Sequence, residues 1–226
     1  MARVCIFDVN ETLLDLRALD PLFERLLGRP ELRRAWFAQL LQSALVSVVT
    51  GPYVDFGRIG RAALAMVAER EGIALPADAG DEIMAGLRRL PPYPDAAPAL
   101  ARLRDAGFRL ASLTNSVEAV AVEQLTNAGL APYFEAILSA DEARRLKPAP
   151  EPYRMAAERL GVPIDGLRLV AAHAWDVVGA LRAGAAAAFV ARPGMVLDPL
   201  GPRPDVVGRD LVEVAEQIVA REAAGA

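Results

Sequence analysis

The chain has 226 residues, of which 54% are hydrophobic, and its formal net charge is −4 with a sequence pI of about 5.2. This acidic balance excludes general nucleic-acid binding, which requires a basic patch. No apolar run reaches the roughly 20 residues that span a bilayer, and no basic and apolar secretion signal is seen, so we expect a cytoplasmic protein without a membrane partner. A single histidine, His173, and a single cysteine, Cys5, exclude a His/Cys zinc cluster and an internal disulfide.

The N-terminal part begins with one strand and continues with helices. The apolar run from Val4 to Phe7 is typical of a buried strand, and it ends on the carboxylate of Asp8. Apolar residues then recur at helical spacing, with Gly or Pro at the breaks, over Leu13 to Leu27, Glu31 to Val49, Phe56 to Glu71 and Ala79 to Leu90. Four helices without a convincing strand predict an inserted all-helical cap domain over residues 15–92.

Strands and helices alternate in the rest of the chain. The predicted strands are Phe108 to Leu113, Ala136 to Leu138, Leu167 to Ala172 and Ala185 to Val190. The predicted helices are Ala96 to Ala106, Val117 to Ala128, Glu151 to Leu160, Val177 to Ala183 and Leu211 to Arg221. This alternation predicts the α/β class, with a parallel sheet covered by helices on both faces and formed by residues 1–14 and 93–226.

Polar side chains follow four of the predicted strands. They are Asp8 after the first strand, Thr114 and Asn115 after the second, Lys147 in the loop after the third, and Asp176 after the fourth. Taken singly, each has an ordinary explanation as a polar turn, a helix N-cap or a solvated lysine. In an open α/β sheet, however, ligands bind at the carboxyl ends of the strands, so we expect these groups to meet at one edge of the sheet.

Together these residues resemble the motifs of the haloacid dehalogenase superfamily, and specifically of its 2-haloacid dehalogenase (type II) branch. The motifs are Asp8 to Thr12 as Asp-x-x-x-Thr, Thr114-Asn115, Lys147-Pro148 and Ala174-Trp175-Asp176, in the family's order and with the helical insert after the first. The resemblance covers nearly the whole chain. It implies a Rossmann-like core under the helical cap, an active site between them, and by analogy a homodimer through the cap helices.

The resemblance to the superfamily does not by itself determine the reaction, because most of its members are phosphatases. Such phosphatases carry a second Asp two residues after the nucleophile and bind magnesium through fourth-motif acids, whereas this chain has Asn10, Ala172 and His173 at these places. Losing a general acid typically costs about 10²–10⁴ in rate. A halide leaves without a proton, which favours dehalogenation of a small anionic substrate, a 2-halo carboxylic acid, with no cofactor. A magnesium-dependent small-molecule phosphatase and a non-catalytic relative that binds an anion or a protein remain the alternatives.

The resemblance implies a covalent mechanism. The ionised carboxylate of Asp8 displaces the halide and leaves an aspartyl ester, which water then hydrolyses. Lys147 is expected to hold that carboxylate, with an attraction on the order of 4 kcal/mol at about 4 Å and an effective dielectric near 20. Asp176 is expected to position or deprotonate the water.

Three further catalytic positions follow from the same motifs. Thr12 and Thr114 are expected to orient the Asp8 carboxylate and the substrate. Backbone N–H groups around Asn115, where a helix starts, are expected to receive the substrate carboxylate.

The chain departs from the type II pattern in the cap and in the fourth motif. Typical members have an Arg just after a Trp in the second cap helix, but here Trp36 is followed by Phe37. Arg33 and Arg34 lie one turn earlier and are candidates to substitute, although solvated surface is their ordinary state. No charge-assisted contact to a substrate anion can come from Phe37.

In the fourth motif, Ala171 and His173 stand where the family usually has a Ser and an Asn that hold the water. We expect His173 in the active site, binding the water or donating to the departing halide, with a hydrogen-bonded structural histidine as the alternative. Because fluoride leaves poorly and benefits from strong donors, fluoroacetate is a possible extension of the substrate range.

Several residues are candidates for contacts with the substrate. They are Asn10, Phe37, Phe56, Tyr153 and Trp175, and for Phe56 and Tyr153 ordinary packing is the alternative. Glu11 takes the place of a frequent Gly and has no assigned role.

Overall fold

The computed structural model describes residues 4–224, which fold around a six-stranded parallel sheet in the order β3-β2-β1-β4-β5-β6. The strands are β1 (Val4–Phe7), β2 (Leu110–Thr114), β3 (Ala136–Ser139), β4 (Leu167–Ala171), β5 (Ala186–Val190) and β6 (Val206–Gly208). In the centre, Cys5 of β1 pairs with Leu110 of β2 and with Arg168 of β4. The predicted α/β class with a parallel sheet is confirmed.

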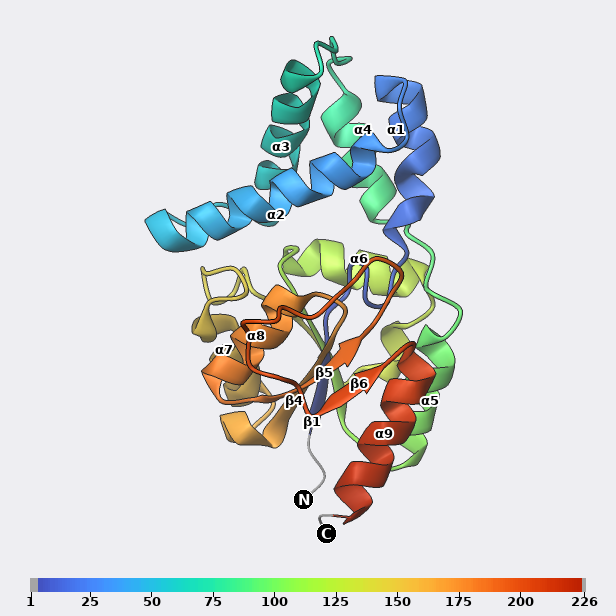
Figure 1. Ribbon diagram of the computed structural model, residues 1–226, viewed down its shortest axis with the longest axis vertical. Helices are drawn as coiled ribbons and strands as arrows, with labels where there is room; N and C mark the ends of the chain where they lie inside the picture. Colours follow the sequence, from blue (N-terminus) through green and yellow to red (C-terminus); the bar gives the residue numbers. More distant parts are fainter. Residues whose placement is uncertain (1–3, 225–226) are drawn as a thin grey trace.

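Helices cover both faces of the sheet, as Figure 1 shows. On one side lie α5 (Ala96–Asp105), α6 (Glu118–Asn127) and α9 (Leu211–Ala224), and on the other lie α7 (Pro150–Arg159) and α8 (Ala174–Ala183). Successive side chains of a strand point to opposite faces, so Cys5 and Phe7 enter the first hydrophobic cluster while Val4 and Ile6 enter the second. All four are buried, which explains why this strand has no polar residue before Asp8.

The segment between β1 and α5 is helical and lies over the carboxyl ends of the strands (Figure 1). It consists of the short 3₁₀ helix η1 (Leu16–Leu19) and of α1 (Asp20–Leu27), α2 (Leu32–Thr50), α3 (Phe56–Arg70) and α4 (Ala79–Leu87), which we call the cap helices. No helix within residues 4–224 is both long and apolar enough to cross a lipid bilayer.

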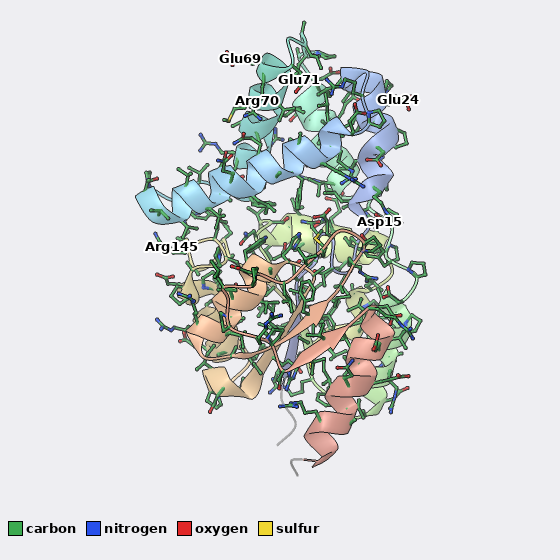
Figure 2. The ribbon with its side chains drawn as sticks, viewed as in Figure 1. Asp15, Glu24, Glu69, Arg70, Glu71 and Arg145 are labelled. Carbon is green, nitrogen blue, oxygen red and sulfur yellow. The ribbon has the colours of Figure 1, made fainter. Side chains whose placement is uncertain are left out.

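The two connections between the cap helices and the sheet run side by side. Asp15 N donates to the carbonyl of Pro91 at 2.9 Å, and Tyr93 N donates to the carbonyl of Leu13 at 2.8 Å. Figure 2 shows Asp15 at this junction. The crossing points lie next to the predicted boundaries at residues 14/15 and 92/93, although the division into two domains stays a prediction.

One predicted helix begins later than expected, and one strand of the sheet was not predicted. The helix expected from Leu13 begins only at Leu16, because Leu13 N and Leu14 N both donate to the carbonyl of Val9 and turn the chain back above β1. The sixth strand, Val206–Gly208, was not predicted, because three residues are too few to show an alternating pattern. Its pairing with β5 is a product of the tertiary fold.

The strand order reverses between β1 and β4. The chain leaves β1 toward β2 and β3 on one side and later returns to β4, β5 and β6 on the other. Ligands of open α/β sheets bind in the crevice at such a reversal, outside the carboxyl ends of the strands. Asp8 directly follows β1 and His173 lies two residues after β4, so both stand at this position.

Candidate active site

The carboxylate of Asp8 is buried and held at both oxygens. Lys147 Nζ donates to Oδ1 at 3.0 Å, and Thr12 Oγ1 donates to Oδ2 at 2.7 Å. The tight turn after β1 brings Thr12 back to the carboxylate, and Ala172 N in turn donates to the Thr12 hydroxyl at 3.0 Å. Burial alone raises the pKa of Asp8, but the charges of Lys147 and His173 and the Thr12 hydrogen bond outweigh it and hold that pKa below its ordinary value. Asp8 is therefore an anion with a fixed orientation.

Lys147 connects Asp8 to a second buried carboxylate. Its ammonium donates to Asp8 Oδ1, to the carbonyl of Leu113 at 2.9 Å and to Asp176 Oδ2 at 2.5 Å, which uses all three of its donors. Burial lowers the pKa of Lys147, but Asp176 and Asp8 more than offset it, so that its pKa is raised. The predicted meeting of Asp8, Lys147 and Asp176 at one edge of the sheet is confirmed.

Asp176 lies deeper than Asp8. Its Oδ1 accepts a hydrogen bond of 2.5 Å from the hydroxyl of Tyr153, and its Oδ2 accepts from Lys147. Burial raises the pKa of Asp176, attraction to Lys147 offsets part of this rise, and the charge of Asp8 adds to it, so that the pKa lies above its ordinary value. Tyr153 was expected to form a pocket wall, with ordinary packing as the alternative. Its side chain is fully buried and its hydroxyl donates to Asp176, which agrees with the alternative.

The second motif holds the loop that carries the lysine. Asn115 Oδ1 accepts from Lys147 N at 2.8 Å, and its Nδ2 donates to the Lys147 carbonyl at 3.3 Å. The hydroxyl of Thr114 accepts from Ser116 N at 3.2 Å, so it stabilises the turn before α6. The side chains of Asn115 and Thr114 thus contact backbone, and their predicted contacts with substrate stay predictions.

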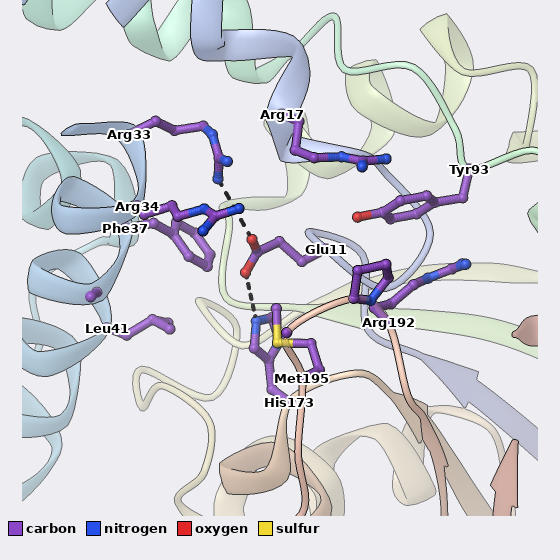
Figure 3. Close-up of a pocket in the computed structure, with 13 residues that line it drawn as sticks. Glu11, Arg17, Arg33, Arg34, Phe37, Leu41, Tyr93, His173, Arg192 and Met195 are labelled. Carbon is purple, nitrogen blue, oxygen red and sulfur yellow. Dashed lines mark hydrogen bonds and ion pairs between the residues drawn. The ribbon is translucent and has the colours of Figure 1, made fainter. Parts of the chain in front are cut away.

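His173, the residue after β4 that stands in place of an Asn, faces Asp8. Its Nδ1 lies 3.4 Å from Asp8 Oδ2. On the other side of the ring, its Nε2 lies 3.0 Å from Oε2 of Glu11, as Figure 3 shows. Its ring stacks on Trp175 with centroids 5.4 Å apart and approaches Phe37 at 6.1 Å. Burial lowers the pKa of His173, but Asp8 and Glu11 outweigh burial and raise it to about 9. At neutral pH the ring is therefore an imidazolium.

Glu11 adopts a backbone conformation that favours glycine. Its φ is 62°, in the left-handed region, which costs an L-residue about 1–2 kcal/mol. This explains why Gly is frequent at the position. Non-glycine residues persist in such conformations mainly at functional sites, where the surroundings fix them. Here the Glu11 carboxylate reaches both His173 and, at 3.9 Å from its Oε1, the guanidinium of Arg33.

A cavity of about 450 Å³ opens above His173 between the cap helices and the sheet (Figure 3). Its charged walls are Glu11 and four arginines, Arg17, Arg33, Arg34 and Arg192, and its apolar walls include Phe37, Leu41 and Met195. Arg34 is exposed, as expected. The expectation of a solvated Arg33 is wrong, because its side chain is 4% exposed and bonded to Asp20.

Two residues predicted to contact the substrate, Asn10 and Phe56, do not line this cavity. Asn10 is buried, and its Oδ1 accepts from Gln124 Nε2 at 3.0 Å. Phe56 lies at the start of α3 and lines a separate small cavity together with Ser116 and Val117. Phe37 and Trp175 both contact the ring of His173, so of the candidate walls these two adjoin the catalytic cluster.

Three residues of this region have contacts that the sequence patterns did not predict. Gln124 holds Asn10 from α6, and Arg192 donates to the carbonyl of Thr12 at 2.8 Å while its Nη1 contacts Asp95. Glu11 was noticed as an unusual residue but received no role. The available signals were the position of Arg192 just after a strand end and the replacement of a Gly by Glu11; Gln124, in mid-helix, gave none.

Comparison with known proteins agrees with this geometry. Residues 2–184 match the model of the haloacid dehalogenase-like hydrolase family. The chain belongs to this family. An (S)-2-haloacid dehalogenase of Xanthobacter autotrophicus is 33% identical over 194 residues, which cover 85% of this chain and 76% of that protein.

Solved structures show the same relationship for this haloacid dehalogenase-like hydrolase. The L-2-haloacid dehalogenase of Xanthobacter autotrophicus with chloropropionic acid covalently bound superposes with a TM-score of 0.90 at 28% identity, covering 96% of this chain and 98% of that one. A defluorinating L-2-haloacid dehalogenase superposes with a TM-score of 0.82 at 25% identity, covering 96% and 95%.

Proposed function

We propose that this hydrolase cleaves the carbon–halogen bond of small 2-halo carboxylic acids through an ester on Asp8. The observation that carries the proposal is the state of Asp8, a buried carboxylate kept ionised and aimed by Lys147 and Thr12 at the reversal point of the sheet. A carboxylate stripped of water and fixed at both oxygens is a competent nucleophile toward a carbon with a leaving group. The relatives named as 2-haloacid dehalogenases support the same reaction class.

The proposed reaction has two halves. First, one oxygen of Asp8 forms a bond to the halogen-bearing carbon, and the carbon–halogen bond breaks with its electron pair leaving on the halide. Water then attacks Cγ of the Asp8 ester, the bond between Cγ and the ester oxygen breaks, and the 2-hydroxy acid leaves with that former Asp8 oxygen as its hydroxyl, while the water oxygen stays on Asp8. The net reaction consumes one water and releases halide and one proton, which regenerates the Asp8 carboxylate.

Lys147 serves the first half by holding the charge that attacks. Its ammonium lies between Asp8 and Asp176, so that two carboxylates share one fully buried cation. An attraction of this kind is worth on the order of 4 kcal/mol at about 4 Å with an effective dielectric near 20. The lysine also fixes which oxygen of Asp8 is engaged and leaves Oδ2 facing Thr12 and His173.

The cation that type II relatives carry on the cap is supplied here by the core. Phe37 takes the place of the cap arginine and packs beside the ring of His173, which is itself an imidazolium. We propose that Nδ1 of His173 donates to the halide as it departs. Because fluoride is the strongest hydrogen-bond acceptor among the halides, this arrangement suits fluoroacetate, and a defluorinating relative supports the extension.

The arginine-lined cavity suits an anionic substrate. The overall charge of −4 does not attract anions. The cavity above His173, however, is lined by Arg17, Arg34 and Arg192, and Glu11 is the carboxylate among its lining residues. A local positive field of this kind raises the concentration of small anions at the entrance. The homodimer expected from family analogy stays a prediction.

The residues around Asp8 do not fit the magnesium ion of the phosphatase alternative. Both oxygens of Asp176 already accept strong hydrogen bonds, and Oδ1 of Asn10 accepts one from Gln124 Nε2. The imidazolium of His173 stands 3.4 Å from Asp8 Oδ2, where it repels a second cation. Magnesium prefers near-octahedral oxygen ligands including carboxylates, and this cluster offers no free pair.

One assay tests the proposal against both alternatives. Halide release is measured with chloro-, bromo- and fluoroacetate and with 2-chloropropionate in the presence of EDTA, and p-nitrophenyl phosphate is tested with magnesium. We expect halide release that persists in EDTA and is abolished by Asp8→Asn, a variant of nearly equal shape. Phosphate turnover alone would establish the phosphatase, and no turnover of any compound would establish the non-catalytic relative.

A further inference from the structure

The two nitrogens of the His173 ring face two different carboxylates. Nε2 lies 3.0 Å from Glu11 Oε2, whereas the buried Nδ1 is ion-paired with Asp8 Oδ2 at 3.4 Å and makes no aligned hydrogen bond within residues 4–224. Trp175 and Phe37 pack on the ring and fix its orientation. Buried polar atoms are normally hydrogen-bonded, so a nitrogen that stands 3.4 Å from the nucleophile without an aligned hydrogen bond indicates a position for a reacting group or a water.

Glu11 contacts His173 from a backbone conformation that is unfavourable for a residue with a side chain. A residue with φ of 62° is most comfortably glycine, yet this chain places there a carboxylate that reaches His173 from one oxygen and Arg33 from the other. Figure 3 shows the Glu11 side chain between Arg33 and His173, at the floor of the cavity. Strain combined with a directed carboxylate is typical of a functional residue.

Asp176, the expected activator of water, is already engaged. Its Oδ1 accepts from Tyr153 and its Oδ2 from Lys147, and its side chain is completely buried. A base must lie within hydrogen-bond reach of the proton that it removes. Nδ1 of His173 is next to Asp8 and has no competing hydrogen bond, so it meets this condition better than Asp176 does.

We propose that Glu11 and His173 form a base dyad for the second half of the reaction, in which Glu11 is a positioning residue and His173 is the general base. This inference rests on the proposed function, because it needs the ester on Asp8. Neutral His173 keeps its proton on Nε2, which donates to the Glu11 carboxylate. Its Nδ1 takes a proton from water while the water oxygen bonds to Cγ of Asp8. The same proton then passes from Nδ1 to the departing 2-hydroxy acid oxygen as the ester bond breaks. The new Asp8 carboxylic acid gives its proton to Nδ1 and restores the ion pair.

The ester itself switches His173 from donor to base. Before alkylation, the anions Asp8 and Glu11 both hold the ring protonated. Alkylation neutralises Asp8, so the pKa of His173 falls and the proton leaves to solvent. The proton lost here is the one proton that the overall reaction releases.

The other charged groups around the His173 ring do not take over the role of Asp8 and Glu11 in keeping it protonated. They are Arg33 and Arg34 from α2, Arg17 from η1, Arg192 after β5, and Lys147 behind Asp8. All five are cations, so they favour the neutral ring, and Asp8 and Glu11 are the two anions that oppose them. Removing either anion therefore lowers the pKa of His173.

The test separates the two halves of the reaction. Enzyme is mixed rapidly with excess chloroacetate, halide is followed through the first turnover, and the ester on Asp8 is quantified by mass spectrometry after acid quench. His173→Phe keeps the stacked ring but has no nitrogen. Loss of the halide donor slows the burst, but we still expect about one halide per site, followed by ester hydrolysis slowed about 10²–10⁴-fold. In Glu11→Gln, which keeps the shape, we expect hydrolysis slowed about 10-fold or more.

The pH profile of ester hydrolysis distinguishes the dyad from a structural role. In the wild type the rate rises with pH as His173 loses its proton, and Glu11→Gln shifts the midpoint to lower pH because an anion is gone. Glu11→Gly, which relieves the strained backbone, repeats both effects if Glu11→Gln folds poorly. Asp20→Asn is the matched control, because it removes the other carboxylate of Arg33 and leaves His173 untouched, so its hydrolysis rate stays within twofold of wild type.

The outcomes are distinct. A wild type that forms no ester and releases no halide overturns the proposed function and the dyad with it. A wild type that turns over, with His173→Phe hydrolysing its ester at the wild-type rate or Glu11→Gln keeping the wild-type midpoint, overturns the dyad alone.

Discussion

The side chain of Asn115 brackets the backbone of Lys147. Its Oδ1 accepts from Lys147 N at 2.8 Å, and its Nδ2 donates to the carbonyl of the same residue at 3.3 Å. The lysine comes from a loop that follows the sheet edge, and this pair of hydrogen bonds aligns that loop with the end of β2. Its ammonium can then reach Asp8 across the carbonyl of Leu113. The second motif therefore acts on the nucleophile through the third.

Replacing Asn115 with Ala should impair catalysis through the position of Lys147. Two buried hydrogen bonds are lost, each worth about 1 kcal/mol, and the Lys147 backbone loses its partners. We expect kcat for chloroacetate to fall about 10-fold or more, while KM changes little. Asn127→Ala, which removes a similar amide bonded to the Arg88 carbonyl on the surface, should leave both constants unchanged. Equal effects of the two variants would contradict the role given to Asn115.

Removing the shared cation should destabilise the fold, and removing one of its anions as well should restore part of the loss. Lys147→Met leaves Asp176 buried without a cation and Asp8 with the His173 imidazolium alone, and breaking comparable buried pairs costs about 3–5 kcal/mol. The double variant Lys147→Met/Asp176→Asn should regain at least about 1 kcal/mol, because one buried charge is gone. Urea denaturation at pH 7 measures both values. A double variant no more stable than the single one would contradict the shared-cation arrangement.

The stability of the fold should fall as the pH rises above neutrality. The pKa of His173 is raised to about 9 in the folded state, against about 6.5 when unfolded, so its contribution is complete below about pH 6.5 and is lost as the pH passes 9. The loss should be on the order of 3 kcal/mol, since the shift is about 2.5 pKa units and one unit corresponds to about 1.4 kcal/mol. Denaturation at pH 6, 7.5 and 9.5 measures it. His173→Phe should lack this fall, and an identical pH dependence in the variant would refute the assignment.

Loss of the imidazole should affect fluoride more than chloride. Fluoride is the stronger hydrogen-bond acceptor and the poorer leaving group, so it depends more on a charged donor beside Asp8. We expect His173→Ala to reduce fluoride release from fluoroacetate at least about 10-fold more than chloride release from chloroacetate. Single-turnover halide measurements isolate the first half of the reaction. Equal losses for the two halides would sink the role of His173 as the halide donor.

Moving the cation from position 173 in the core to position 37 in the cap should preserve activity only when both substitutions are made together. Phe37→Arg puts a further cation beside the His173 imidazolium, and His173→Asn removes that imidazolium, so each single change should lower halide release. The double variant Phe37→Arg/His173→Asn carries the residues typical of the type II branch. We expect it to be at least about 10-fold more active than the product of the single effects predicts. Strict additivity would show that the two positions are independent.

Much of the core and the chemistry could be predicted from local sequence. The apolar run of β1, the alternation after residue 93 and the motif residues Asp8, Lys147 and Asp176 each carry their signal within a few positions. Strand ends of a parallel sheet meet at one edge whatever the details of packing, so the cluster around Asp8 followed from the order of the elements.

The contacts that define individual roles depended on residues far apart in the chain. Glu11 and His173 are 162 positions apart, and Asn115 and Lys147 are 32 apart, so no local pattern links them. Arg33 looked like a surface residue because its burial is created by neighbours on other segments, Asp20 and Glu11.

The sequence by itself determined that a carboxylate follows a buried strand in an α/β hydrolase and that the residues expected of a phosphatase are missing. The tertiary structure alone decided which partners each polar group has. It bonded Asp176 to Tyr153 and Lys147, bonded Asn115 to the lysine loop, and placed Nδ1 of His173 3.4 Å from Asp8 Oδ2. The physical reason is that the secondary structure is specified by nearby residues, whereas burial, charge pairing and therefore pKa depend on which segments meet in space.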